Sequence, residues 1–221
     1  MISKAELDFL SELAQNNNRE WFAENKKRFE KHQEIIKKFF QEINTEFAPQ
    51  DSIEKMQVHR IYRDVRFSKD KTPYKSNFSV SFDRTKPHLR GGYYLHIQPG
   101  ASFVGGGFWE PNAPDLKRIR KEFELDDSEI RAIISDKRFI ETFGTLQGSE
   151  LKTAPKDFDK EHPAIDLIRK KQYIVYRRFT DAEVTDKNFK AEILKTFSAM
   201  RPFFDYMSDV LGTNLNGEPI Y

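Results

Sequence analysis

The most chemically distinctive part of the chain is a short basic segment, residues 60–75, which reads RIYRDVRFSKDKTPYK. Arginine can hold a phosphate or carboxylate with two parallel hydrogen bonds, and lysine adds a mobile point charge. The Thr72-Pro73 step predicts a rigid bend that directs Lys71 and Lys75 to one place. We therefore expect an anion-binding loop that contains Arg60, Arg63, Arg66, Lys69, Lys71, Tyr74 and Lys75.

The same segment also has a structural interpretation. Arg63 or Arg66 could pair with Asp64 or with a distant carboxylate and so tie the loop to the rest of the fold. A run of charges is also often no more than a solvated surface. From the sequence, anion binding and internal bracing are both open.

A second place for an anion is the glycine run Gly105, Gly106 and Gly107. Glycine lets backbone amides approach a ligand closely, and a helix expected to begin near Pro114 would add partial positive charge. The run matches neither the phosphate-loop pattern nor the dinucleotide pattern. A bulge or a close crossing of two chain segments is the simpler explanation.

His96 is the candidate for acid–base chemistry. It lies in a predicted strand, on the polar face that also carries Tyr94 and Gln98. If Ser79 and Ser81 share this face, a small polar pocket forms, in which His96 could transfer a proton near neutral pH. A hydrogen-bonded structural histidine is the alternative. The spacing of the histidines matches no metal motif and GxSxG is absent, so we predict no metal and no cofactor.

The periodicity around these residues predicts an α+β fold. Long amphipathic helices at the N-terminal and C-terminal ends should pack on a central, mostly antiparallel sheet. The loops between the first three predicted strands are too short for helical crossovers, which indicates a meander. The expected strands are 78–82, 93–97, 102–109 and 173–179, and the main expected helices are 3–14, 19–47, 114–123, 130–134, 139–143 and 189–210.

Composition limits the class of protein. The 221 residues are 38% hydrophobic and 33% charged, which fits one folded domain over 1–221. The net charge is only +2, so a basic surface must come from local clustering. There is no cysteine, no signal-like start and no apolar stretch long enough for a membrane span. We expect a cytoplasmic protein without a membrane partner.

Several long motifs resemble one family. RDVRFSKDKTPYKSNF and YYLHIQPGASFVGGGFWEP resemble bacterial conserved hypothetical proteins of the domain of unknown function 2461 family. NNNREWF and LKTAPKDFDKEHPAI are similar to the same family, and the resemblance spans about residues 7–211. It implies one soluble domain and no particular activity, cofactor or catalytic residue.

Three functions follow as hypotheses. The first is binding of an anionic, phosphate-bearing small molecule by the basic loop, with or without a reaction. The second is a nucleic-acid-binding module, because a second basic cluster could extend the positive surface. The third is a non-catalytic interaction or scaffold domain with an internally braced loop. The second cluster comprises Arg169, Lys170, Lys171, Arg177 and Arg178.

Overall fold

The computed structural model describes all 221 residues, and the contacts within the chain gather them into two compact units. Each unit is assembled from three separate segments. The prediction of a single domain is not tested by this division and stays a prediction. Unit 1 comprises Met1–Phe82, Tyr94–Val104 and Arg178–Lys195, and unit 2 comprises Asp83–Tyr93, Gly105–Arg177 and Thr196–Tyr221.

Five antiparallel strands form a sheet in chain order, which confirms the α+β class and the predicted meander. One strand, Ile53–Val58, was missed by the sequence reasoning. Its side chains are half-buried or exposed and two of them are charged, as is common at the edge of a sheet. The strands are β1 (Ile53–Val58), β2 (Phe78–Arg84), β3 (Gly92–Ile97), β4 (Ser102–Phe108) and β5 (Tyr173–Phe179).

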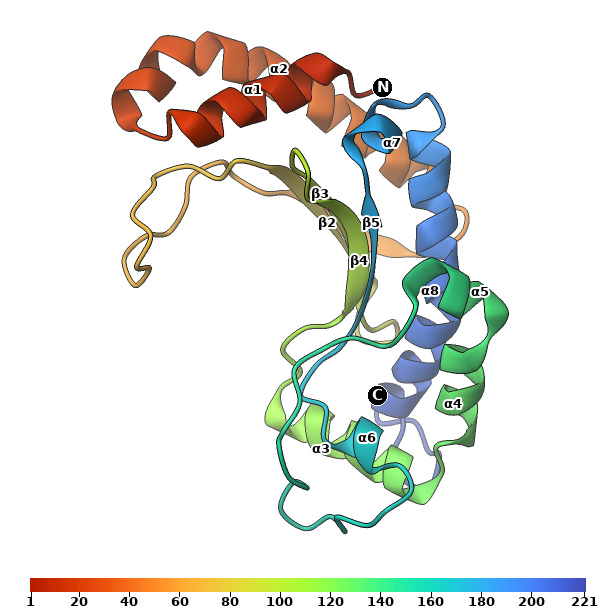
Figure 1. The fold of residues 1–221 in the computed structure, drawn as a ribbon. Coiled ribbons are helices and arrows are strands. Elements are labelled where there is room, and N and C mark those ends of the chain that lie inside the picture. The colour runs from red at the N-terminus through yellow and green to blue at the C-terminus, as the bar shows by residue number, and fades with distance from the viewer. The chain divides into compact units, whose positions relative to one another are not determined.

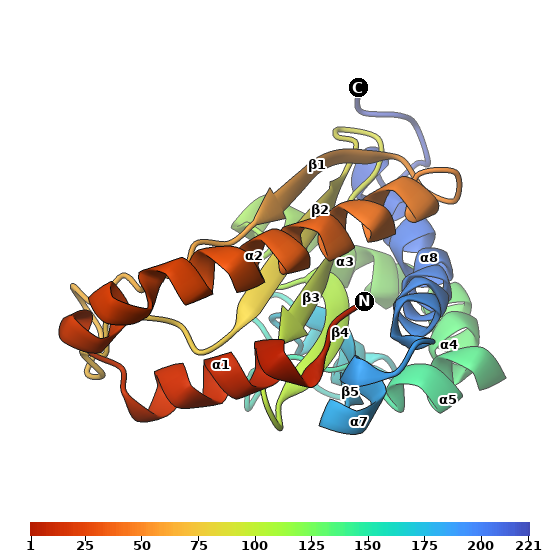
Figure 2. The same cartoon turned by 90° about the horizontal axis from the view of Figure 1, so that it is seen from above.

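Unit 1 contains two long helices, α1 (Lys4–Gln15) and α2 (Arg19–Phe47), which lie side by side in Figures 1 and 2. Ser3 and Glu6 form a capping box at the start of α1. The ring of Phe29 on α2 lies 6.2 Å from that of Phe78 on β2, so α2 packs on the sheet. A short helix, α7 (Asp181–Thr185), completes this unit.

Unit 2 contains most of the other helices, in which α3 packs with α6 and α4 with α5. The C-terminal helix α8 (Phe189–Gly212) belongs to unit 2 from Thr196 onward. There its Phe197 and Phe204 rings lie 4.7 and 5.0 Å from the ring of Tyr93, so it packs on the sheet as predicted. The remaining helices are α3 (Ala113–Leu125), α4 (Ser128–Ser135), α5 (Lys137–Phe143) and α6 (Ile165–Ile168).

None of the helices combines the length and the apolar character that crossing a bilayer requires.

Candidate anion-binding site

Residues 60–77 connect β1 and β2 as a long bent loop, called here the hairpin, which projects from the strands in Figure 1. Tyr62 and Tyr74 form an antiparallel bridge at its base. Tyr74 is buried, and its ring stacks on Phe22 of α2 at 4.0 Å. Burial raises the pKa of the Tyr74 hydroxyl. Tyr74, predicted to bind the anion, therefore packs against α2 and anchors the hairpin.

Two predicted anion ligands, Arg63 and Arg66, have carboxylate partners inside the hairpin. Arg63 donates to Asp70 and to the Thr72 hydroxyl. Arg66 donates to the two carboxylate oxygens of Asp64 at 3.0 and 2.6 Å. Hydrogen bonds from Thr72 and from Arg63 lower the pKa of Asp70 to about 2. Both arginines thus pair with carboxylates of the hairpin itself, although Arg66 is 77% exposed.

The other four cations of the hairpin form no ion pair. Lys71 donates to the Val65 carbonyl oxygen at 2.9 Å, and Lys69 and Arg60 are exposed. Lys75 is half-buried. Burial lowers the pKa of the Lys75 ammonium, and the nearby charge of Arg60 lowers it further. Arg60 and Lys75 are therefore neighbouring cations, and neither forms an ion pair, although the charge of Arg60 helps to lower the pKa of Asp64.

The alternation of side chains along β2 separates an apolar face from a polar one. Phe78 is buried beneath α2, whereas Ser79 and Ser81 are oriented to the opposite face. The Ser79 hydroxyl hydrogen-bonds Tyr94 of β3, and Ser81 Oγ lies 2.7 Å from His59 Nε2. The structure thus brings both serines to the face of Tyr94, as the polar-pocket hypothesis required.

His96 is the centre of a hydrogen-bonded row, Tyr94–His96–Gln98, called here the His96 row. Tyr94 Oη lies 3.2 Å from His96 Nδ1, and His96 Nε2 lies 2.9 Å from Gln98 Oε1. Because an amide oxygen only accepts, Nε2 carries a proton, and in the neutral ring Nδ1 then accepts from Tyr94. Burial lowers the pKa of His96, and the charge of Lys75 contributes to the lowering. The imidazole, whose charged form is disfavoured, therefore lies near the Lys75 ammonium.

The sequence model of a family described as "Conserved hypothetical protein (DUF2461)" matches residues 5–206. The chain belongs to the DUF2461 family. The resemblance seen in the sequence motifs is thereby confirmed. No curated protein and no solved structure matches this DUF2461 chain. The family description states no activity, so the properties of the site follow from its geometry.

The glycine run of this DUF2461 protein serves close packing within unit 2. Gly105, Gly106 and Gly107 lie inside β4. A Cβ atom on Gly106 would lie 2.5 Å from the Gly92 carbonyl oxygen, and one on Gly107 would lie 2.3 Å from that of Tyr173. These contacts support the structural explanation of the run. That the glycines bind an anion stays a prediction.

Members of the second basic cluster also have structural partners in the DUF2461 fold. Arg169 donates to Glu150 at 3.4 Å, and Arg177 donates to the Thr196 hydroxyl at 3.3 Å. Both contacts lie within unit 2. They indicate that at least these two arginines hold segments of the chain together.

The most deeply buried charge was missed by the sequence reasoning. Arg84 at the end of β2 is fully buried and donates to Asp205 of α8. It also donates to Ser208 Oγ at 3.2 Å and to the Arg90 carbonyl oxygen at 3.1 Å. The signal was present, because period-two alternation places Arg84 on the same face as the apolar Phe82.

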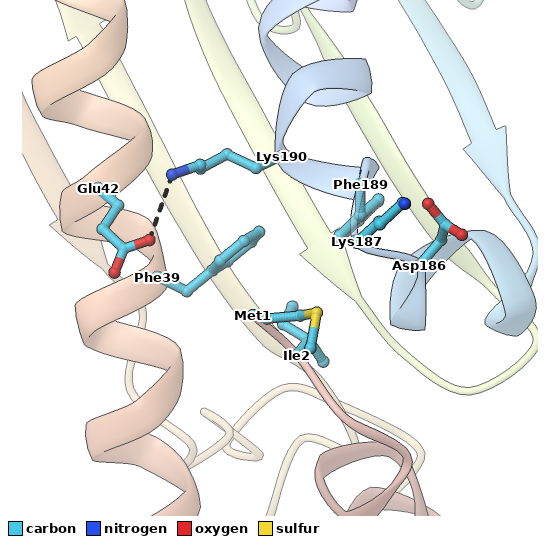
Figure 3. Close-up of a pocket in the computed structure, with 8 residues that line it drawn as sticks. All are labelled: Met1, Ile2, Phe39, Glu42, Asp186, Lys187, Phe189 and Lys190. Carbon is cyan, nitrogen blue, oxygen red and sulfur yellow. Dashed lines mark hydrogen bonds and ion pairs between the residues drawn. The ribbon is translucent and has the colours of Figure 1, made fainter.

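A pocket of about 240 Å³ in unit 1 lies between α2 and the first turn of α8 (Figure 3). Its Lys190 already pairs with Glu42 at 3.4 Å and with Glu46. The rings of Phe39 and Phe189 stack at 6.0 Å and line it. Because carboxylates neutralise Lys190, this pocket suits an anion less well than the hairpin does. The other lining residues are Met1, Ile2, Asp186 and Lys187.

No group of three or more His, Asp or Glu side chains is placed so that it could hold a metal ion.

Proposed function

We propose that this protein binds an anionic, phosphate-bearing small molecule between Arg60 and Lys75, beside the His96 row. The observation that carries the proposal is the Lys75 ammonium, which is half-buried, lies near a second cation and forms no ion pair. A charge withdrawn from water needs an opposite charge or hydrogen bonds to be stable. An anion bound at this place would supply both.

A phosphate group suits these donors better than a single carboxylate does. Its several acceptor oxygens can take two parallel hydrogen bonds from the Arg60 guanidinium and one from the Lys75 ammonium. The Ser81 hydroxyl lies on the same polar face, where it bonds to His59 and could also meet a ligand oxygen. Because burial and Lys75 lower the pKa of His96, the ring adds no further positive charge to the site near neutral pH.

The proposal assigns different roles to the cations of the hairpin. Arg63 and Arg66 brace it, and Lys69 and Lys71 lie farther along it. Arg60 and Lys75 hold the anion. We also propose a cytoplasmic location, in keeping with a sequence that has no cysteine.

A non-catalytic interaction domain is the second candidate. The pairs Arg63–Asp70 and Arg66–Asp64 favour it, because they hold the hairpin in shape without a ligand. Under this alternative, phosphates would leave the stability of the protein unchanged.

Thermal unfolding with inorganic phosphate, pyrophosphate and ribose 5-phosphate at low ionic strength tests the proposal. A bound phosphate raises the Tm of the wild-type protein by mass action. We expect Lys75→Met to abolish the rise and Lys137→Met to keep it, because Lys137 on α5 is 87% exposed and distant in sequence from the hairpin. No rise with any of the three phosphates would contradict the proposal.

A further inference from the structure

Phe67 is the most exposed large apolar side chain of the protein, with 96% of its surface accessible. It lies near the bend of the hairpin, and the Arg66 guanidinium carbon is 6.0 Å from the centroid of its ring. Burial of Phe67 contributes almost nothing to folding, because the side chain is nearly as exposed as in the unfolded chain. The ring is therefore available to a partner.

The backbone around Phe67 is held in place by the rest of the hairpin. The Ser68 amide donates to the Val65 carbonyl oxygen at 3.4 Å, and Lys71 Nζ donates to the same oxygen at 2.9 Å. Arg66 is fixed by its two hydrogen bonds to Asp64. A side chain presented on a braced loop loses less conformational entropy on binding than one on a free loop.

The charges near Phe67 complement a polyanion. Residues 60–75 contain six cations against two carboxylates, and both carboxylates are engaged by arginines of the hairpin. Lys69 and Lys71 follow Phe67 directly in the chain and form no ion pair. An accessible aromatic face beside mobile cations is the combination that binds single strands, through base stacking and phosphate contacts.

We propose that the tip of the hairpin binds single-stranded nucleic acid, with a base stacked on Phe67 and phosphates at Lys69 and Lys71. This inference concerns a different part of the hairpin from the Arg60–Lys75 site and does not depend on the small-anion proposal. A single strand is favoured over a duplex because its bases can turn out of the stack and expose a face to the ring.

A membrane surface fits the tip less well. Ser68, Lys69, Asp70 and Lys71 follow Phe67, so that insertion of the ring would draw a carboxylate and several polar groups into the headgroup region. One aromatic side chain without a second apolar anchor gives only weak, reversible membrane binding. A base stacked on Phe67 leaves these polar groups in water.

The test is fluorescence polarisation of the full chain with labelled oligo(dT) and oligo(rU) of about 15 nucleotides, a length that covers a typical single-strand site. We expect binding that weakens steeply as salt rises from about 50 to about 200 mM. Phe67→Ala and Phe67→Leu should both weaken binding about tenfold, and Phe67→Tyr should retain it, because a planar ring is what a base stacks on. Lys69→Ala should make the slope of log K against log salt concentration shallower, by the amount expected for the loss of about one phosphate contact.

Trp109→Ala is the matched control, since Trp109 is also an exposed aromatic residue, at 63%, and lies outside the hairpin. It should bind the oligonucleotides as the wild-type protein does. The inference is overturned if the wild-type protein binds neither oligonucleotide, if Phe67→Ala binds as tightly as wild type, or if Trp109→Ala causes an equal loss. Phe67-dependent binding to phosphatidylserine vesicles without oligonucleotide binding would also overturn it and assign the tip to membranes.

Discussion

The hydroxyl of Tyr94 lies 3.2 Å from Nδ1 of His96, and Gln98 Oε1 lies 2.9 Å from the other ring nitrogen. With the ring neutral, as burial favours, Nε2 donates to Gln98 and Nδ1 accepts from Tyr94. Protonation of His96 would remove the acceptor and place a positive charge near Lys75, which itself lies near Arg60. The protonation state of His96 therefore affects the total positive charge at the anion site.

The first prediction concerns pH. The folded-state pKa of His96 lies below its ordinary value of 6.5, because burial and Lys75 disfavour the charged ring. At pH values between the folded-state pKa and 6.5, the unfolded chain binds more protons than the folded protein does. The stability gained from neutral His96 is therefore fully present above about pH 6.5 and is lost as the pH falls through the folded-state pKa.

Urea unfolding of the wild-type protein and of His96→Gln at about pH 7.5 and about pH 5 checks this prediction. The wild-type protein should be more stable than His96→Gln, and the difference should be larger at the higher pH. A difference that grows on acidification, or an NMR titration that places the pKa of His96 above 6.5, would show that the charged ring is the favoured form.

The second prediction concerns the ligand-free stability of the anion site. Lys75 is half-buried and unpaired, so its charge disfavours the folded state. Lys75→Met keeps the length of the side chain and removes the charge. We expect the variant to unfold at the same or a higher urea concentration than wild type in phosphate-free buffer. A clear loss of stability would mean that the ammonium has a stabilising partner within the protein and does not need a bound anion.

Much of the fold follows from local patterns of the sequence. The long helix Arg19–Phe47 has the predicted bounds, because its apolar residues recur at helical spacing and Asn18 caps its first turn. Alternation in β2 and β3 also placed Ser79 and Ser81 on the face of Tyr94 and His96. Strand β1 has no such pattern, since an edge strand with polar side chains on both faces resembles a loop.

The site itself was predicted only in part. The residue types identify the cations but not which of them are neutralised, because that depends on how the hairpin closes. Arg63 meets Asp70 only after the bend at Thr72 has formed. The pair Arg84–Asp205 joins residues 121 positions apart in the chain, and no local pattern specifies such a distant partner.

The third prediction concerns this buried pair. Asp205→Ala would leave the fully buried Arg84 guanidinium without its carboxylate, which should lower the free energy of unfolding by about 3–5 kcal/mol. Arg84→Met should cost less, because Asp205 is 45% exposed and also pairs with Arg201 at 3.2 Å. Arg66→Ala is the surface control and should leave the urea midpoint unchanged. If Asp205→Ala and Arg84→Met lowered the free energy of unfolding equally, the prediction that the loss of Asp205 costs more than the loss of Arg84 would be wrong.

The fourth prediction concerns the glycine run in β4. A Cβ atom on Gly106 would meet the Gly92 carbonyl oxygen at 2.5 Å and the Phe204 ring at 2.8 Å, so Gly106→Ala should cost roughly 2–3 kcal/mol. Gly144→Ala is the control, because a Cβ atom there meets nothing within 4 Å and only its positive φ opposes the change. That strain should cost about 1 kcal/mol. Denaturant unfolding measures the stability of both variants. If Gly106→Ala were as stable as wild type, close packing would not explain the glycine, and a role in ligand binding would be favoured.

Calorimetric titration of pyrophosphate into the wild-type protein and into Lys75→Met, at low and at moderate salt, measures whether the hairpin holds an anion. We predict a one-to-one association in the wild-type protein that weakens with salt, is lost in Lys75→Met and is retained in Lys137→Met. Absence of binding in the wild-type protein, or equal binding by Lys75→Met, would contradict an anion site at Arg60 and Lys75 and leave the hairpin as an internally braced structural element.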